Sequence, residues 1–181
     1  MFELLLSFFL LTLSLLALSI IWRIKARKYI SSGTVASAYD AWTEDKLLER
    51  LWGEHIHLGF YPSGRGNLDF RKAKVQFVHE LVKWSGLDKL PKGSRILDVG
   101  CGIGGSSRIL AKYYGFNVTG ITISPAQVKR ARELTPSRLN CNFQVMDALD
   151  LKFEDGSFDA VWSVEAGAHM IDKTKFADEM L

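Results

Sequence analysis

A glycine-rich turn between a short apolar strand and a helix is the feature that most constrains the fold of this 181-residue chain. The segment runs from Leu97 to Ser107 and reads LDVGCGIGGSS. Glycines at such a junction let the backbone turn tightly and approach a ligand at the carboxyl end of the strand. The segment therefore predicts an α/β fold with a ligand site at one end of a parallel sheet.

Apolar runs typical of strands alternate with helical segments around this turn. The runs are GSRILDVG, NVTGITIS, NFQVMDA and DGSFDAVWSVEA, and helices are expected over SSRILAKYYG and PAQVKRAREL. Ser124 is a favourable N-cap for the second of these helices, and Pro125 is a favourable first residue. Apolar residues recur every three or four positions from Asp69 to Trp84, which predicts an amphipathic helix. The alternation predicts a Rossmann-like, doubly wound and mostly parallel sheet.

The amino-terminal segment is strongly apolar. Residues 4–22, LLLSFFLLTLSLLALSIIW, carry no charge and have about the length that a helix needs to cross a membrane. Arg23, Lys25, Arg27 and Lys28 follow it, and such a basic cluster keeps its side cytoplasmic, or stromal in a plastid. We expect a single transmembrane anchor with the remaining chain on that side. A signal peptide is one alternative, although its positive charge would precede the apolar run. A peripheral or buried helix is the other.

The net charge of +3 arises partly from this basic cluster. The expected partner is therefore the lipid bilayer with its anionic headgroups, rather than nucleic acid. Cys101 and Cys141 form no disulfide framework and are expected to be small reduced core residues. The sequence contains no recognisable cluster of metal ligands.

Three regions are expected along the chain. Residues 1–30 form the anchor with its basic flank, residues 31–92 a helical cap over the ligands, and residues 93–181 the Rossmann-like domain. After the anchor we expect the short connector YISSGTVASAYD, followed by the helical AYDAWTEDKLLERLWG and the loop EHIHLGFYPSGRGN. The chain stops inside the helix-like KTKFADEML, so we expect a fragment that lacks part of the sheet.

The glycine turn fits two ligand patterns. Gly100, Gly102 and Gly105 give Gly-x-Gly-x-x-Gly, which is typical of dinucleotide sites. Asp98 with Gly100, Gly102 and Gly104 gives Asp-x-Gly-x-Gly-x-Gly, which is typical of S-adenosyl-L-methionine sites.

Asp98 distinguishes the two patterns. Its carboxylate would repel a pyrophosphate by about 1 kcal/mol at 4 Å in water, and it would attract the ammonium of a methionine group. A dinucleotide site also needs an acid at the end of the second strand to hold the ribose. That strand ends in Thr122-Ile123-Ser124. The residues therefore favour S-adenosyl-L-methionine.

The motif GITIS followed by PAQ resembles the branch of methyltransferases that contains sterol C-methyltransferases, cyclopropane fatty-acid synthases and tocopherol-pathway methyltransferases. The resemblance implies that Thr122, Ile123 and Gln127 meet the ribose and the adenine edge. It also implies that Asp147 and Ala148 meet the adenine. The full set of expected cofactor residues is Tyr39, Asp98, Gly100, Cys101, Gly102, Gly104, Thr122, Ile123, Gln127, Asp147 and Ala148.

Three longer motifs narrow the resemblance. They are YDAWTEDKLLERLWGEHIHLGFY, LDVGCGIGGSSRILAKYYGFNVTGITISPAQVKRA and VWSVEAGAHM, and from about Val35 to Leu181 the chain is similar to cyanobacterial-type methyltransferases of prenylated benzoquinols. This implies ring methylation of a phytyl or solanesyl benzoquinol in tocopherol and plastoquinone biosynthesis. The γ-tocopherol methyltransferases differ at few of these positions and remain an alternative, as do sterol-type C-methyltransferases.

Transfer of a methyl group to a ring carbon requires that the ring hydroxyl lose its proton, or begin to lose it. Glu165 is the expected acceptor or base because it follows the fourth strand, with His169 assisting. His55, His57 and Trp52 are expected to line the substrate, and Tyr39 or Trp52 to cover the sulfonium with an aromatic face. The alternatives from other classes are a membrane-tethered binding module without chemistry and a nicotinamide oxidoreductase.

Overall fold

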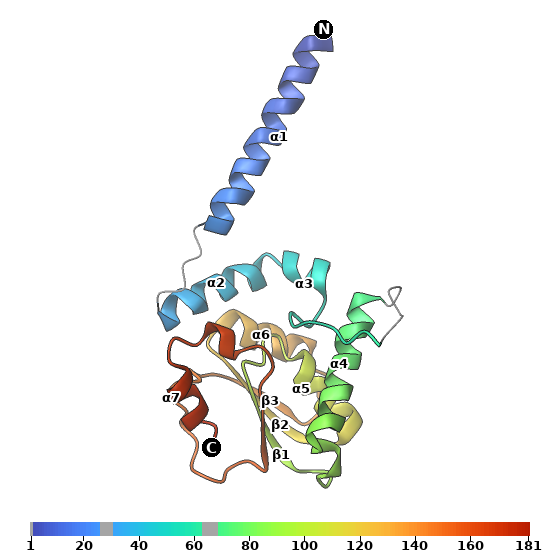
Figure 1. Ribbon diagram of the computed structural model, residues 1–181, viewed down its shortest axis with the longest axis vertical. Coiled ribbons are helices and arrows are strands. Elements are labelled where there is room, and N and C mark those ends of the chain that lie inside the picture. The colour runs from blue at the N-terminus through green and yellow to red at the C-terminus, as the bar shows by residue number, and fades with distance from the viewer. Residues whose placement is uncertain (1, 26–30, 63–68) are drawn as a thin grey trace.

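The computed structural model describes residues 2–25, 31–62 and 69–181, and its centre is a four-stranded parallel sheet (Figure 1). The strands are β1 (Arg95–Val99), β2 (Asn117–Thr122), β3 (Cys141–Val145) and β4 (Ala160–Trp162), in the order β3-β2-β1-β4. β1 pairs with both β2 and β4, and Asp98 lies opposite Gly120 and Trp162 in the two registers. The predicted Rossmann-like parallel sheet is confirmed.

The helices follow the predicted order. They are α1 (Phe2–Lys25), α2 (Ser32–Glu44), α3 (Leu47–Trp52), α4 (Phe70–Ser85), η1 (Leu87–Lys89), α5 (Gly105–Ile109) with its π-helical continuation η2 (Leu110–Tyr114), α6 (Pro125–Leu134), η3 (Gly167–His169) and α7 (Lys173–Asp178). The predicted start of α6 is confirmed, because the Gln127 amide donates to Ser124 Oγ at 3.1 Å.

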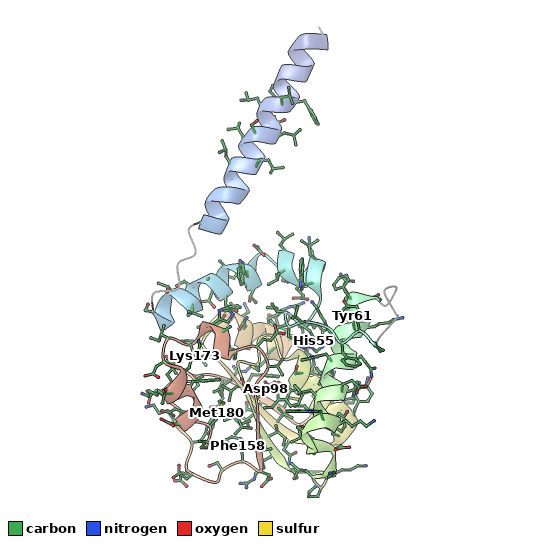
Figure 2. The ribbon with its side chains drawn as sticks, viewed as in Figure 1. His55, Tyr61, Asp98, Phe158, Lys173 and Met180 are labelled. Carbon is green, nitrogen blue, oxygen red and sulfur yellow. The ribbon has the colours of Figure 1, made fainter. Side chains whose placement is uncertain are left out.

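Side chains alternate across β1 and divide the core between the two faces of the sheet. Ile96 packs in one cluster with Val78 of α4 and Leu110 of η2. Leu97 packs in another cluster with Phe176 of α7. Figure 1 shows α4 and α7 on opposite sides of the strands, and Figure 2 shows the side chains that fill the space between them.

The strand order reverses at β1. The chain moves outward from β1 to β3 and then returns to the other side of β1 as β4. In open α/β sheets the crevice at such a reversal, beyond the carboxyl ends of the strands, is where ligands bind. The glycine turn after β1 and the segment after β4 both open into this crevice.

The predicted connector before the cap is wrong. The helix α2 begins at Ser32, because Ser31 and Thr34 form a reciprocal capping box in which the Thr34 amide donates to Ser31 Oγ and the Ser31 amide donates to Thr34 Oγ1. The single helix predicted after the connector is also interrupted, since Lys46 adopts the left-handed conformation (φ 52°) and separates α2 from α3. The division into regions 1–30, 31–92 and 93–181 stays a prediction.

The predicted membrane anchor is contradicted. Within the part of the chain that the structure describes, no helix combines the length and the apolar character that crossing a membrane requires. A crossing helix needs about twenty consecutive apolar residues, and the side chains described in α1 are those of residues 8–19. The rest of the predicted segment and its basic flank lie outside the residues whose side chains are described. The expected location of the protein, which depended on this anchor, is withdrawn.

Phe116 tests the core between the sheet and α4. It is 1% exposed and belongs to the cluster of Val78 and Leu110. Replacing Phe116 with Ala is expected to lower the free energy of unfolding by about 3–5 kcal/mol, because the change leaves a cavity. Urea denaturation measures the loss. The control Trp84→Ala, at a side chain that is 83% exposed, should change the free energy by much less, and an equal loss at both sites would contradict the packing.

Candidate active site

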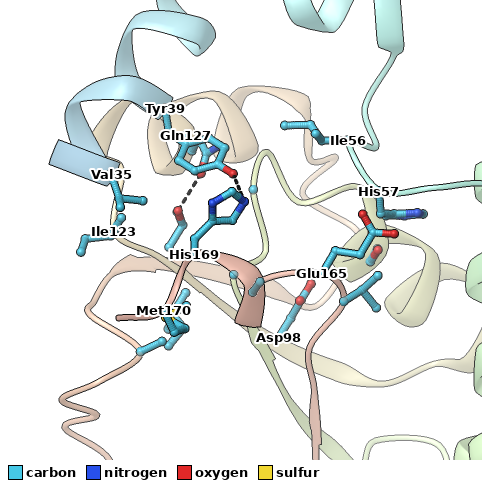
Figure 3. Close-up of a pocket in the computed structure, with 18 of the residues that line it drawn as sticks. Val35, Tyr39, Ile56, His57, Asp98, Ile123, Gln127, Glu165, His169 and Met170 are labelled. Carbon is cyan, nitrogen blue, oxygen red and sulfur yellow. Dashed lines mark hydrogen bonds between the residues drawn. The ribbon is translucent and has the colours of Figure 1, made fainter. Parts of the chain in front are cut away.

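A cavity lies at the carboxyl ends of the strands and is lined by most of the residues singled out in the sequence. Figure 3 shows Tyr39 and Gln127 on one side of it, Asp98 on the opposite side, and Glu165 pointing toward His57. The predicted residues that line it are Tyr39, His55, His57, Asp98, Gly100, Gly102, Thr122, Ile123, Gln127, Asp147, Ala148, Glu165 and His169. Trp52, Cys101 and Gly104 lie outside this lining.

The glycine turn uses its three alternating glycines in the left-handed region. Gly100, Gly102 and Gly104 have φ values of 78°, 55° and 79°. A Cβ at Gly100 would lie 2.5 Å from the Ala166 Cβ, whereas a Cβ at Gly102 would meet no atom within 4 Å. Gly100 therefore brings the segment after β4 against the turn, and Gly102 leaves open space.

Gly105, the third glycine of the dinucleotide pattern, is needed here for packing against the cap. It lacks a positive φ, but a Cβ there would lie 2.6 Å from the Glu54 carbonyl oxygen and 2.8 Å from His55 Cε1. The missing side chain at Gly105 thus lets the loop with the two histidines pack directly on the start of α5. The structure matches the pattern of Asp98, Gly100, Gly102 and Gly104.

Asp98 is a buried carboxylate at the floor of the cavity. It is 2% exposed and accepts a hydrogen bond from Ser107 Oγ at 2.5 Å. Burial raises its pKa to about 6. Among the described residues, none forms an ion pair with it. A cationic ligand group in the cavity would offset the cost of burying this charge.

The end of β2 forms a second polar wall. Thr122 Oγ1 donates to Gln127 Oε1 at 2.6 Å, and the side chain of Gln127 is buried at 4% exposure rather than facing solvent (Figure 3). The bond occupies the amide oxygen of Gln127. Its side-chain nitrogen donates to no other described residue, so its N–H groups are available to a ligand in the cavity.

Asp40 makes a contact beside the site that the sequence did not predict. From α2 its Oδ1 accepts hydrogen bonds from Ser124 Oγ at 2.5 Å and from the Ala126 amide at 3.1 Å. It thereby ties the cap to the first turn of α6. Asp40 is more than eighty residues away from both partners in the sequence. No local pattern around Asp40 predicts the contact.

Asp147 and Ala148 follow β3 and line the cavity. Asp147 Oδ1 accepts a hydrogen bond from the Leu149 amide at 2.9 Å, which fixes the turn. Ala148 is buried. The geometry allows Asp147 to cap this turn and to face a ligand at the same time.

Glu165 and His169 come from the segment after β4 and both contact the cap. Glu165 adopts the left-handed conformation (φ 58°), which is rare for a residue with a side chain, and its Oε1 accepts a hydrogen bond from the Leu58 amide at 3.0 Å. His169 Nε2 lies 2.8 Å from the Tyr39 hydroxyl (Figure 3). The two predicted catalytic residues therefore also hold the cap over the cavity.

His55 and His57 lie side by side in the loop after α3. His57 Nε2 is 3.1 Å from His55 Nδ1, and His57 Nδ1 is 2.8 Å from the Leu58 carbonyl oxygen. Burial lowers the pKa of both, that of His55 to about 3. Both imidazoles are therefore neutral near neutral pH.

Lys74 is a buried lysine that supports this loop and that sequence reasoning also missed. It is 5% exposed, and its Nζ donates to the carbonyl oxygens of His55 at 2.7 Å and of Trp52 at 3.2 Å. Burial lowers its pKa. A signal was present, because Lys74 falls between Phe70 and Phe77 on the apolar side of the predicted helix.

Trp52 and the two cysteines have surroundings that the sequence did not specify. Trp52 is 49% exposed, and the Lys74 ammonium lies 5.6 Å from its ring centroid. Cys101 and Cys141 are free thiols, and burial raises the pKa of both. The Cys101 side chain therefore packs from the glycine turn into a core cluster with Val128 and Phe143, as a neutral thiol.

The profile of a family described as "Methyltransferase domain" matches residues 96–181. The chain is 60% identical over 172 residues to 2-methyl-6-phytyl-1,4-hydroquinone methyltransferase of Synechocystis sp.. This alignment covers 95% of this chain and 54% of that relative. The chain is 44% identical over 145 residues to the chloroplastic tocopherol O-methyltransferase of Arabidopsis thaliana. This alignment covers 75% of this chain and 42% of that relative. The chain spans about half the length of these curated relatives.

Among solved structures, the chain is similar to the [4+2]-cyclase SpnF. The TM-score is 0.72 at 29% identity, over 82% of this chain and 54% of that chain. The likeness extends over the cap as well as the sheet.

Ser107 tests the electrostatics of the cavity floor. Its hydroxyl stabilises the ionised form of Asp98, so Ser107→Ala is expected to raise the pKa of Asp98 further above its value of about 6. A pH titration of the Asp98 carboxyl carbon by NMR measures the change. Ser106→Ala serves as the neighbouring control, and a pKa that stays constant or falls in Ser107→Ala would refute the assigned hydrogen bond.

Proposed function

Residues 96–181 belong to the methyltransferase domain family, and on this premise we propose that the protein transfers a methyl group from S-adenosyl-L-methionine to a ring carbon of a prenylated benzoquinol. The family match confirms the predicted methyltransferase fold and S-adenosyl-L-methionine as its cofactor. The single observation that carries the proposal is the buried Asp98 carboxylate, which faces a cavity and has no cationic partner among the described residues. The proposed pathway is tocopherol and plastoquinone biosynthesis.

The residues present fit this cofactor. The Asp98 carboxylate suits the ammonium of the methionine group, and Gly102 leaves space for the methionine chain. The free N–H groups of Gln127 and the Thr122–Ile123 backbone suit the ribose and the adenine edge, with Asp147 and Ala148 at the adenine. When bound, the cofactor supplies an electrophilic methyl group on a sulfonium.

The substrate proposal rests on the relatives. One relative that is 60% identical is named for 2-methyl-6-phytyl-1,4-hydroquinone, and one that is 44% identical is named for tocopherol. We therefore propose a 2-methyl-6-phytyl or 2-methyl-6-solanesyl benzoquinol, with γ-tocopherol as the second candidate. A prenyl tail resides in a lipid phase, so the bilayer stays a predicted partner.

The proposed roles in catalysis follow from the contacts. Glu165 supplies the negative charge that favours ionisation of the ring hydroxyl, and His169 assists from the wall that it shares with Tyr39. His55 and His57 face the substrate. Tyr39 covers the sulfonium with its ring. Trp52 stays a predicted substrate residue, although it lies outside the cavity lining.

Labelled methyl transfer tests the function. In three separate assays, the full-length protein is incubated with labelled S-adenosyl-L-methionine together with one acceptor. The acceptors are 2-methyl-6-phytyl-benzoquinol, γ-tocopherol and a sterol. The expected result is label on the benzoquinol ring, with a kcat/KM at least tenfold above that for γ-tocopherol. Preferential methylation of γ-tocopherol would favour the second candidate, and label on none of these compounds would refute the proposal.

Asp98→Asn tests the contact with the cofactor. Loss of an ionised partner for the ammonium is expected to raise the Kd of S-adenosylhomocysteine about 10- to 100-fold by calorimetry, whereas the exposed Asp155→Asn should leave it unchanged. In the parent protein the affinity should be constant above pH 6 and fall by up to tenfold per unit below it, because the Asp98 carboxyl must then lose a proton to pair with the ammonium. Equal affinities of parent and Asp98→Asn would contradict the contact.

A further inference from the structure

The hydrogen bonds of the two cavity histidines define their tautomers. The Leu58 carbonyl oxygen is only an acceptor, so the 2.8 Å contact requires a proton on His57 Nδ1. In the neutral ring His57 Nε2 is then an acceptor. The 3.1 Å contact between His57 Nε2 and His55 Nδ1 therefore requires a proton on His55 Nδ1.

This chain of bonds leaves one unprotonated nitrogen, His55 Nε2. Within the described ranges, it makes no hydrogen bond to another residue. His55 lines the cavity and is half-buried. Among the described residues, Trp162 Nε1 is the one fully buried side-chain nitrogen or oxygen without a hydrogen-bond partner, so His55 Nε2 is not fully buried. His55 Nε2 thus presents a lone pair in an accessible part of the site.

The position of His55 is fixed from three sides. Lys74 Nζ holds its carbonyl oxygen at 2.7 Å, and the absence of a side chain at Gly105 lets its ring pack on the start of α5. The preceding residue, Glu54, forms an ion pair with Arg108 at 2.6 Å.

The charges around the pair favour a proton on His57 over one on His55. Glu165 raises the pKa of His57, whereas Arg108 and Lys74 both lower the pKa of His55. Lys74 acts on both rings, and Glu54 partly neutralises Arg108. Figure 3 shows the Glu165 side chain directed toward His57. A positive charge on the pair is therefore best stabilised at His57.

The two predicted catalytic residues, Glu165 and His169, each already make a hydrogen bond. Glu165 Oε1 accepts the Leu58 amide at 3.0 Å, and His169 Nε2 contacts the Tyr39 hydroxyl at 2.8 Å. Unlike His169 Nε2, His55 Nε2 can accept a proton without first breaking a hydrogen bond to another described residue. Glu165 lies on the far side of His57, where its carboxylate can stabilise a positive charge on that ring.

We propose that His55 Nε2 accepts the proton of the substrate hydroxyl and that His55 and His57 form a two-histidine relay with Glu165 as its counter-charge. The inference rests on the proposed function and assigns the proton to a group other than Glu165. Glu165 then acts as a positioning residue, because it stabilises the charged relay and anchors Leu58.

The proton movements balance. The ring hydroxyl gives its proton to His55 Nε2, while the proton on His55 Nδ1 moves to His57 Nε2 and leaves the positive charge on His57. The ring, now a phenolate, forms a carbon–carbon bond to the methyl group as the carbon–sulfur bond breaks. Water takes the proton of the methylated ring carbon, and the relay returns its proton to the ring oxygen.

Nitrogen NMR of the histidines tests the relay without turnover. In full-length protein with bound S-adenosylhomocysteine, His55 and His57 should both show the tautomer protonated at Nδ1 near neutral pH. Glu165→Gln should lower the pKa of His57. A proton on His55 Nε2, or an unchanged pKa of His57 in Glu165→Gln, would overturn the relay even if the protein methylates no quinol.

Single-turnover kinetics with S-adenosyl-L-methionine and a prenylated benzoquinol test its use in catalysis. His55→Gln keeps a hydrogen-bond acceptor but accepts no proton, and it should slow methyl transfer about 100-fold or more while the Kd of S-adenosylhomocysteine changes less than threefold. The matched control is His79→Gln, since His79 contacts Tyr114 outside the cavity, and its rate should equal that of the parent.

A second substrate separates a proton acceptor from a structural role. With a fluorinated benzoquinol whose hydroxyl is already ionised at the assay pH, the loss in His55→Gln should shrink to less than tenfold. An equal loss with both substrates, or a His55→Gln rate within threefold of the parent, would overturn the proposal. Failure of the parent protein to methylate either quinol would instead refute the proposed function.

Discussion

The burial of one carboxylate at the end of the central strand is the constraint on which the rest of the site depends. Asp98 lies in the middle of the sheet, where β1 pairs on both sides, and only Ser107 donates to its side chain among the described residues. An ionised group in this position is costly without a cation. The strand reversal beside β1 places a cavity over it. Fold and electrostatics therefore converge on a ligand with a positive charge.

The cap is attached to this site chiefly by polar contacts. Asp40 binds the start of α6, Glu49 pairs with Arg130 at 2.6 Å, and Leu58 donates to Glu165. In residues 31–62, Val35 and His57 are the side chains that are buried. Glu165, which has a proposed role in catalysis, is thus also one of the residues that hold the cap over the cavity.

Local patterns predicted much of the fold and many of the residues that line the cavity. The strands, the glycine turn and the capped start of α6 follow from residues that are neighbours in the sequence. The capping box at Ser31 was also local and was overlooked. Asp40, the Gly105–His55 contact and the orientation of the two histidines depend on contacts between distant segments, which no periodicity encodes. The membrane anchor was inferred from the length of an uncharged apolar run and from the basic residues that follow it, and the described helices contradict it.

A crystal structure of the full-length protein with S-adenosylhomocysteine tests the central claim most directly. The account predicts that the ammonium of the ligand lies within 3.5 Å of an Asp98 oxygen or is bridged to it by one water, with the ribose at Thr122 and Gln127. A ligand that binds with its ammonium away from Asp98, or outside the cavity at the carboxyl ends of the strands, would contradict the account.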